Sequence, residues 1–135
     1  MKTVLIIDRA LPLGLIANTA AVLGISLGAA APEIVGQDVP DADGHRHRGI
    51  TNKTIPILGG TGEQLRLLRD RLFAAEFAEV GVVDFSDIAQ SSLDYGYYAG
   101  TLASTPGDRL SYLGLCLYGP DKLINKLTGS MGLLR

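Results

Sequence analysis

Residues 10 to 32 carry no charged side chain, and this uncharged stretch limits the possible folds more than any other feature of the sequence. It follows Thr3 to Ile7, an apolar run rich in β-branched residues and typical of a strand buried on both faces. Leu11 to Gly14 is typical of a turn, and Leu15 to about Gly28 of a helix. Because this helix has few polar residues, we expect it to be buried on most of its sides.

The same stretch is also similar in composition to a signal peptide or a membrane span. Asp8 and Arg9 interrupt the apolar run where a signal peptide would be continuous. Several small or polar residues, among them Asn18 and Ser26, are poorly suited to a span that faces lipid. We therefore expect a cytoplasmic protein with no membrane partner.

The chain has 135 residues, 47% of them hydrophobic, which suffices for one core but not for two ordinary domains. We expect a single domain over residues 1–135. A net charge of -2 without a long basic stretch gives no strong signal for nucleic-acid binding. The one cysteine, Cys116, lies in an apolar run, which favours an inert core thiol over a nucleophile.

Local patterns predict the remaining helices. Thr61 and Gln64 form a capping box at the start of a helix that we expect to reach about Phe77. On that helix the pattern places leucines on one face and turns Arg66, Arg69 and Asp70 toward water. Two further helices are predicted, one capped by Ser86 and ending near Ser92, and one between Pro120 and Gly129.

Short apolar runs predict further strands at residues 33–37, 55–58, 80–85 and 110–117. Pro56 indicates that its strand lies at an edge of the sheet. The polar segment 38–48, with its proline, glycine and charges, is predicted to be a loop. Strands that alternate with helices predict an α/β three-layer sandwich with a mixed, largely parallel sheet.

The opening strand, residues 2–7, is followed by Gly14 and an alanine-rich helix, and the closing segment contains Gly119-Pro120 and Thr128-Gly129. In these features both ends of the chain resemble the type II peptidyl-tRNA hydrolases. The resemblance implies the hydrolase fold, but the chemistry departs from it. Where that family has a lysine, an acidic residue and a threonine, this sequence has Leu15, Tyr98 and Leu102. We therefore expect no hydrolysis by the family's route, and whether the chain is an enzyme stays open.

A broader pattern consists of Asp8, Leu11-Pro12, Gly14, Ala17-Asn18, Gly36, residues 41–44, Pro56, Asp84-Phe85 and Gly119-Pro120. This pattern resembles an uncharacterised bacterial family, domain of unknown function two thousand, a branch of the same superfamily. It implies the fold and no assigned activity. A homodimer is possible, because the superfamily often assembles in this way.

Three polar residues are candidates for a ligand site at the carboxyl ends of the strands, where open α/β sheets bind ligands. Asp8 follows the first strand, Asn18 lies one turn into the first helix, and Asp84 lies near the end of a later strand. The alternative is that the aspartates pair with an arginine or cap a helix, and that Asn18 bonds a backbone group.

The segment 41–48 contains Asp41, Asp43, His45 and His47, whose groups are suitable for metal binding or proton transfer. Two neighbouring arginines oppose a bound cation, so we expect no metal and a solvated loop. Within this segment Asp41 and His45 remain candidates for contact with a polar or anionic ligand.

Three tyrosines, Tyr95, Tyr97 and Tyr98, lie beside glycines and could form a stacking wall for a flat ligand. Filling between helix and sheet, or a subunit interface, is the alternative interpretation that we favour. The glycines form no phosphate-binding motif, and we expect no cofactor.

Three functions are thus compared. The first is binding of a small polar molecule in a cleft at the carboxyl end of the first strand, through Asp8, Asn18 and the 41–48 loop. The second is a hydrolase or transferase with a rewired site, in which His45 transfers the proton. The third is a structural or interaction module. A His45 side chain that points into the cleft would favour the enzyme, and one that faces solvent would favour binding.

Overall fold

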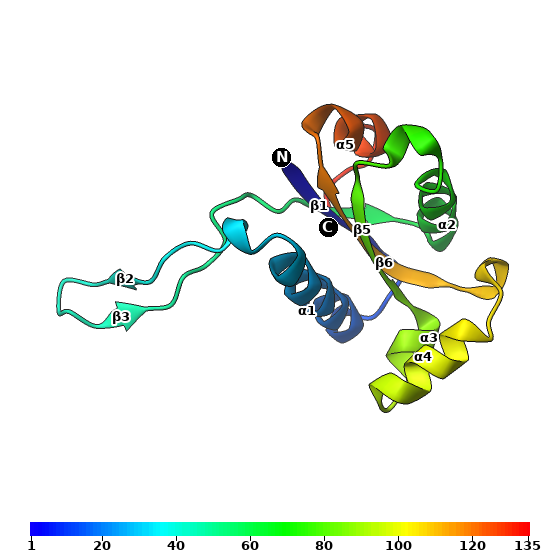
Figure 1. Cartoon of the computed structure of the whole chain (residues 1–135), viewed down its shortest axis with the longest axis horizontal. Coiled ribbons are helices and arrows are strands. Elements are labelled where there is room, and N and C mark those ends of the chain that lie inside the picture. Colours follow the sequence, from blue (N-terminus) through cyan, green and yellow to red (C-terminus); the bar gives the residue numbers. More distant parts are fainter.

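The computed structural model describes all residues, 1–135, as a four-stranded sheet covered by helices on both faces, with a two-stranded ribbon that projects to one side (Figure 1). The sheet has the order β4-β1-β6-β5. Its strands are β1 (Lys2–Asp8), β4 (Ile57–Gly60), β5 (Gly81–Ser86) and β6 (Tyr112–Gly119).

The sheet is mixed, as expected, but it is not largely parallel. Only β1 and β4 pair in parallel, whereas β6 pairs antiparallel with both β1 and β5. The reason lies in the connection before β6. The helices α3 (Asp87–Ser91) and α4 (Tyr95–Ala103) return the chain to the end of the sheet at which β5 finishes. The strand β6 therefore starts at that end and runs in the direction opposite to β5.

Three helices cover the two faces of the sheet. The helix α1 (Leu13–Ala30) lies on one face, and α2 (Gly62–Arg71) and α5 (Asp121–Thr128) lie on the other (Figure 1). Each face has its own core. The α1 side contains Leu5, Leu23, Leu27, Phe85 and Cys116, and the α2 side contains Ile6, Leu65, Leu115, Leu117 and Ile124. Alternate residues of β1 and β6 supply the two cores, as the strand period requires.

The predicted helix starts are confirmed. The Thr61 hydroxyl accepts a hydrogen bond from the Gln64 amide at 3.1 Å, and the Gln64 side chain accepts one from the Thr61 amide at 2.9 Å. The Ser86 hydroxyl accepts from the Ala89 amide at 3.4 Å. The helix α2 ends at Arg71 rather than near Phe77, because a turn and a short 3-10 helix, Ala75–Phe77, fold Phe77 into the core.

The helix α1 is much less buried than its sequence predicts. Only Thr19, Leu23 and Leu27 are buried among its 18 residues. A helix that is apolar on every side can still place only one stripe, at a spacing of four residues, against a flat sheet. By length and composition alone α1 could cross a membrane, which is weak evidence in a helix that also packs on a sheet.

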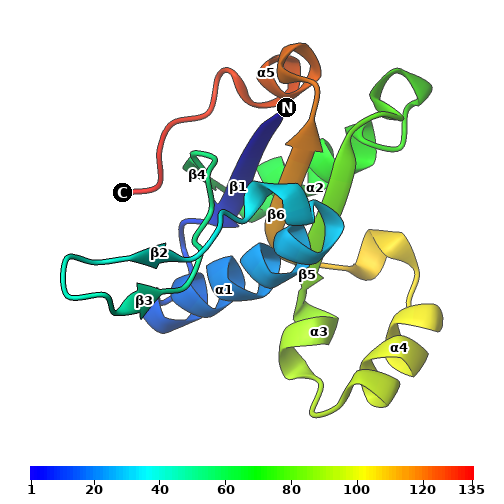
Figure 2. The same cartoon turned by 60° about the vertical axis from the view of Figure 1, so that its left-hand side comes forward.

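The segment after α1 also differs from expectation. The strand predicted at 33–37 is absent, and Pro32–Ile34 forms a 3-10 turn. Inside the predicted loop lies a hairpin of β2 (Val39–Pro40) and β3 (Arg46–His47), closed by a turn with Gly44 at φ +84°. We call residues 35–52 the arm, because they project from the body of the molecule (Figure 2).

The strand β4 lies at an edge of the sheet, as Pro56 indicates. The last residues of the chain cover that edge. Leu58 and Leu133 form an antiparallel bridge, and the Gly59 amide donates to the Gly132 carbonyl at 3.0 Å. Figure 2 shows this terminal segment beside β4.

Candidate functional site

One hollow, which we call the β1 cleft, lies at the carboxyl end of β1. After β1 the chain enters α1 on one face of the sheet, and after the neighbouring parallel strand β4 it enters α2 on the other face. Open α/β sheets bind ligands at such switch points. The β1 cleft has a volume of about 380 Å³ and is lined by Asp8, Leu11, Gly62, Glu63, Arg66, Leu110, Ser111, Tyr112 and Leu113.

Two carboxylates of the β1 cleft lie at the start of α2. Oδ1 of Asp8 accepts from the Ala10 amide at 3.0 Å, and Oδ2 lies 3.6 Å from where a Cβ on Gly62 would stand. Glu63 is in the first turn of α2 and its side chain is exposed. The positive end of the helix dipole stabilises anionic groups at this position. Oδ2 of Asp8 and the carboxylate of Glu63 accept no hydrogen bond within the chain, so both can accept one from a ligand.

The opposite wall of the β1 cleft is held by an arginine. The Nη2 atom of Arg66 donates to the carbonyls of Asp108 at 2.8 Å and Leu110 at 2.6 Å. This fixes the backbone just before β6, where Ser111 and Tyr112 line the cleft. Burial raises the pKa of the Tyr112 hydroxyl, and the negative charge of Asp84 adds to the rise. The phenol therefore stays protonated at neutral pH and can donate a hydrogen bond.

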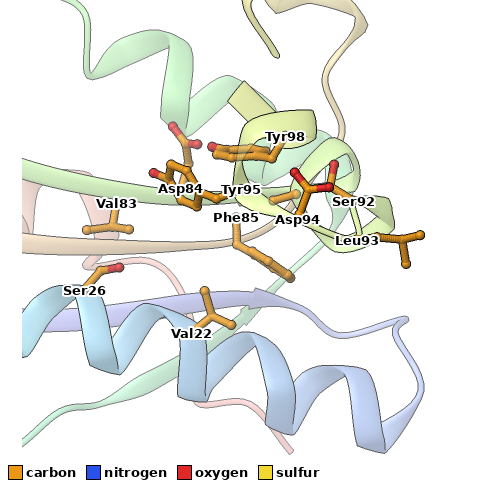
Figure 3. Close-up of a pocket in the computed structure, with 11 residues that line it drawn as sticks. Val22, Ser26, Val83, Asp84, Phe85, Ser92, Leu93, Asp94, Tyr95 and Tyr98 are labelled. Carbon is orange, nitrogen blue, oxygen red and sulfur yellow. The ribbon is translucent and has the colours of Figure 1, made fainter. Parts of the chain in front are cut away.

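A second hollow, of about 400 Å³, lies where α1 faces α3 and α4 (Figure 3). Asp84 and Tyr98 lie on one side of β5, and Phe85 points from the other side toward Val22 of α1. Oδ2 of Asp84 accepts from Nε of Arg69 at 3.0 Å, so this carboxylate already has a cationic partner. The other residues that line it are Ser26, Val83, Ala89, Ser92, Leu93, Asp94 and Tyr95.

Tyr95 and Tyr98 of α4 line the second hollow. Tyr95 and Tyr98 pack edge to face with ring centroids 5.3 Å apart. Tyr95 and Tyr97 are exposed, so they do not fill the space between helix and sheet. Burial raises the pKa of Tyr98, with smaller contributions from Asp84 and Tyr95. A stacking wall and an interface both remain compatible with this position.

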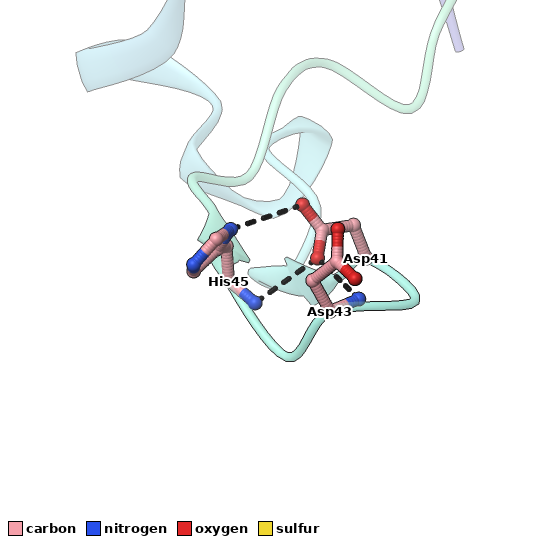
Figure 4. A group of neighbouring side chains, drawn as sticks. All are labelled: Asp41, Asp43 and His45. Carbon is pink, nitrogen blue, oxygen red and sulfur yellow. Dashed lines mark hydrogen bonds and ion pairs between the residues drawn. The ribbon is translucent and has the colours of Figure 1, made fainter.

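Asp41, Asp43 and His45 of the arm lie together at its turn (Figure 4). Oδ1 of Asp41 accepts from the amides of Asp43 at 2.9 Å and His45 at 3.0 Å. Oδ2 of Asp41 lies 2.8 Å from Nε2 of His47 and 3.8 Å from Nδ1 of His45. The hydrogen bond with His47 is the main reason that the pKa of Asp41 is lowered.

This geometry assigns the cluster to the hairpin turn. Ligand-type atoms of Asp41, Asp43 and His45 do lie within 4.8 Å of one another. Oδ1 of Asp41 nevertheless closes the turn through the amides of Asp43 and His45, as in an Asx turn, and Oδ2 is already bound by His47. The His45 side chain is 80% exposed and lines neither hollow, so it faces solvent rather than the cleft.

The six predicted ligand residues fall in four places. Asp8 lines the β1 cleft, Asp84 and Tyr95 line the second hollow, Asp41 and His45 lie on the arm, and Asn18 lies on the exposed side of α1. The expected meeting of Asp8, Asn18 and Asp84 is therefore wrong. The strand β6 separates β1 from β5, and Asn18 neighbours the buried Thr19 but is itself turned away from the sheet.

Four residues of the β1 cleft were not predicted: Glu63, Arg66, Ser111 and Tyr112. The outward position expected for Arg66 and Arg69 is also wrong, because both bind groups of the fold. The capping box does locate the start of α2. A parallel pairing of β1 with β4 would have brought that helix start next to Asp8, but nothing local in the sequence indicates this pairing.

Comparisons with known proteins agree on the fold. A solved structure of a protein of unknown function from Agrobacterium tumefaciens strain C58 is similar to this chain with a TM-score of 0.87 and 18% sequence identity, over 98% of this chain and 96% of the other. The search of curated proteins gives no match. The family model described as "Protein of unknown function (DUF2000)" matches residues 1–135. The chain therefore belongs to this family, as the sequence pattern of Asp8, Gly14 and Asp84-Phe85 indicates.

Proposed function

We propose that the chain binds a small polar molecule in the β1 cleft. The observation that carries this proposal is the position of two unpartnered acceptor groups, Oδ2 of Asp8 and the carboxylate of Glu63, at a switch point of the sheet. Tyr112 and Ser111, whose side chains carry hydroxyl groups, line the same space. Asn18 and the 41–48 loop, which the sequence assigned to this cleft, take no part.

The chemistry of the β1 cleft favours a ligand with several hydroxyl or amino groups. The two carboxylates accept hydrogen bonds, and hydrogen bonds to charged groups are stronger than those between neutral groups. The guanidinium of Arg66 already donates to two carbonyls, so it holds the wall more than it attracts an anion. Polyols and small amines are therefore better candidates than phosphate esters.

Thermal stabilisation across a set of polyols, amines, amino acids, nucleotides and metal ions tests the proposal. A ligand that binds the folded state raises the melting temperature by mass action. We expect a hit among polyols or amines, and loss of that hit in Asp8→Asn and Glu63→Gln. Asp43→Asn is the matched control, because this exposed carboxylate lies on the arm outside both hollows.

Two results would contradict the proposal. A hit that survives Asp8→Asn but disappears in Tyr98→Phe would place the site in the second hollow. No hit across the whole set would favour the structural or interaction module over a small-molecule binder.

The enzyme hypothesis based on His45 has less support. Its discriminating feature was a His45 side chain within hydrogen-bond reach of Asp8 or Asp84, and His45 instead lies on the arm beside Asp41. Binding without chemistry is accordingly the function that we favour.

We further infer a distant relation to the type II peptidyl-tRNA hydrolases, without their activity, and a cytoplasmic, bacterial protein. Supporting this inference are the resemblance of both chain ends and the bacterial source of the similar solved structure. Leu15, Tyr98 and Leu102 stand where that family has reactive or positioning groups. An assay with peptidyl-tRNA that shows turnover would contradict the inference.

A further inference from the structure

One side of α1 forms an apolar stripe that nothing in the chain covers. Leu13, Ala17, Ala21 and Ile25 recur every four residues and are all exposed. Leu13 is 82% and Ile25 75% exposed, which is a large apolar area for one helix face. We call these four residues the outer stripe. Together with Ala29, which is also exposed, they form a ridge along α1 that faces away from the buried residues Thr19, Leu23 and Leu27.

Three glycines in α1 also indicate that another polypeptide can approach this helix. A Cβ added at Gly14, Gly24 or Gly28 would meet no atom within 4 Å. Glycine inside a helix is less favourable than alanine, and no contact within this chain requires it. Small residues allow the backbone of another element to approach a helix closely. The outer stripe and these glycines therefore leave room for a second polypeptide.

The arm also has apolar residues that the rest of the chain does not cover. Its register is constant from the base, where Val35 faces Thr51, to the tip, where Pro40 faces Arg46. Val39 is exposed on one face of the ribbon and Ile50, 80% exposed, on the other. A lone two-stranded ribbon is only marginally stable in water unless it packs against something.

We propose that a second copy of the chain covers both surfaces, with the arm of each copy lying along the outer stripe of the other. Such an exchange is symmetric and closes after two copies. The helix α1, with 18 residues, is roughly 27 Å long. The eight facing pairs of the arm, from Val35 with Thr51 to Ala42 with Gly44, span roughly the same length when the ribbon is extended.

The area that this arrangement buries is near the lower limit for a specific pair. A contact of roughly 27 Å by 10 Å, made twice per copy, covers roughly 540 Å² on each partner, a total just above the roughly 1,000 Å² that a biological interface should bury. No lysine or arginine lies on α1, whereas helices that lie on anionic membranes are basic. A second copy therefore fits the outer stripe better than a lipid surface does.

The molar mass of the purified full-length protein in solution is the first test, measured by light scattering during gel filtration. We expect a dimer for the native chain and for Leu67→Asp, which changes an apolar residue, 55% exposed, on α2. We expect a monomer for Ile25→Asp. The far-ultraviolet circular dichroism of Ile25→Asp should match that of the native chain, because Ile25 contacts no core.

Mixed disulfide formation tests the arm itself. Ala21→Cys is mixed with Val39→Cys or with Ile50→Cys under mild oxidation, while the native Cys116 stays buried. We expect a cross-linked dimer from one of the mixtures and none from any variant alone. The mixture that reacts identifies the face of the ribbon that docks.

Three results would overturn the proposal. One is a monomer at all concentrations, and another is a dimer that Ile25→Asp does not change. The third is absence of any cross-link while the native chain sediments with vesicles of phosphatidylcholine and phosphatidylglycerol, which would assign the outer stripe to a membrane surface.

Discussion

The two helices α1 and α2 lie on opposite faces of one sheet, yet their sequences constrain them very differently. The helix α2 has leucines on one side and charged residues on the other, a capping box at its start and two arginines in its last turn. The helix α1 has no charge, no side-chain cap and no contrast between its sides. The difference in polarity between the two sides of a helix, rather than its total hydrophobicity, indicates which face is buried.

The comparison also concerns what each helix leaves exposed. Two arginines of α2 bind groups of the fold, because Arg66 donates to carbonyls and Arg69 pairs with Asp84. The outer stripe of α1 is exposed along its length. The two arginines of α2 thus have partners within the chain, whereas the outer stripe of α1 is buried only if another molecule covers it.

The largest expected effect tests whether both faces have a fully packed core. Leu23→Ala under α1 and Leu65→Ala under α2 each remove a side chain with no exposed surface. Each should lower the free energy of unfolding by about 2 to 5 kcal/mol, through lost burial and the cavity left behind. Urea denaturation measures both. A loss below about 1 kcal/mol for Leu23→Ala alone would show that α1 is only loosely attached.

A smaller effect is expected at alkaline pH, from Cys116 in the core under α1. Burial raises the pKa of this thiol from 9.0 to about 12. Below pH 9 both states keep the proton. Between pH 9 and about 12 the unfolded thiol ionises and the folded one does not, so the unfolded state binds fewer protons and stability falls as pH rises.

The loss from Cys116 amounts to at most about 4 kcal/mol by pH 12. The Cys116→Ala variant should therefore lose less stability than the native chain between pH 9 and 11, measured by urea denaturation at each pH. Equal slopes for the two proteins would mean that the thiol is reached by water in the folded state.

The capping box allows a test of the difference between the two helix starts. Thr61→Ala removes the hydroxyl that accepts from the Gln64 amide, and it should cost about 1 kcal/mol. Native-state hydrogen exchange should show faster exchange in the first turn of α1, which begins after Pro12 without a side-chain cap, than in that of α2. Thr61→Ala should reduce this difference in exchange rate. An unchanged difference would mean that the capping box does not stabilise the start of α2.

The smallest expected effect is a gain in stability. Gly24→Ala, made in the Ile25→Asp background, should raise the free energy of unfolding by about 0.5 to 1 kcal/mol, because the new methyl group meets open space. Thermal or urea denaturation measures it. In the native background the gain should shrink if the glycine allows close approach of a second copy. A gain that is the same in both backgrounds would indicate that Gly24 lies outside any interface.

Much of the framework follows from local sequence. Thr3 to Ile7, the Thr61 capping box, the Ser86 cap and the edge position of Pro56 were all predicted from residues near one another in the chain. The arm, the helix α4 and the antiparallel direction of β6 were not. Short polar strands and a helix rich in tyrosine and glycine have weak periodicity, and strand direction depends on where the preceding segment returns.

The candidate site was predicted in part. Asp8 could be placed at the end of a buried strand, and it does line a cleft. Its neighbours Glu63, Arg66 and Tyr112 are between 55 and 104 positions away along the chain, so only strand order brings them together. The histidines, which look most reactive in the sequence, instead form a turn with Asp41.

The sequence by itself determined the α/β class, the two apolar layers of the sheet and the start of α2, because period and capping depend on neighbouring residues. The tertiary structure decided which strand lies beside which, and thereby which polar groups share a cleft. It also decided that only one stripe of α1 is covered, because the area of a sheet face, and not the hydrophobicity of a helix, limits how much of that helix can be buried.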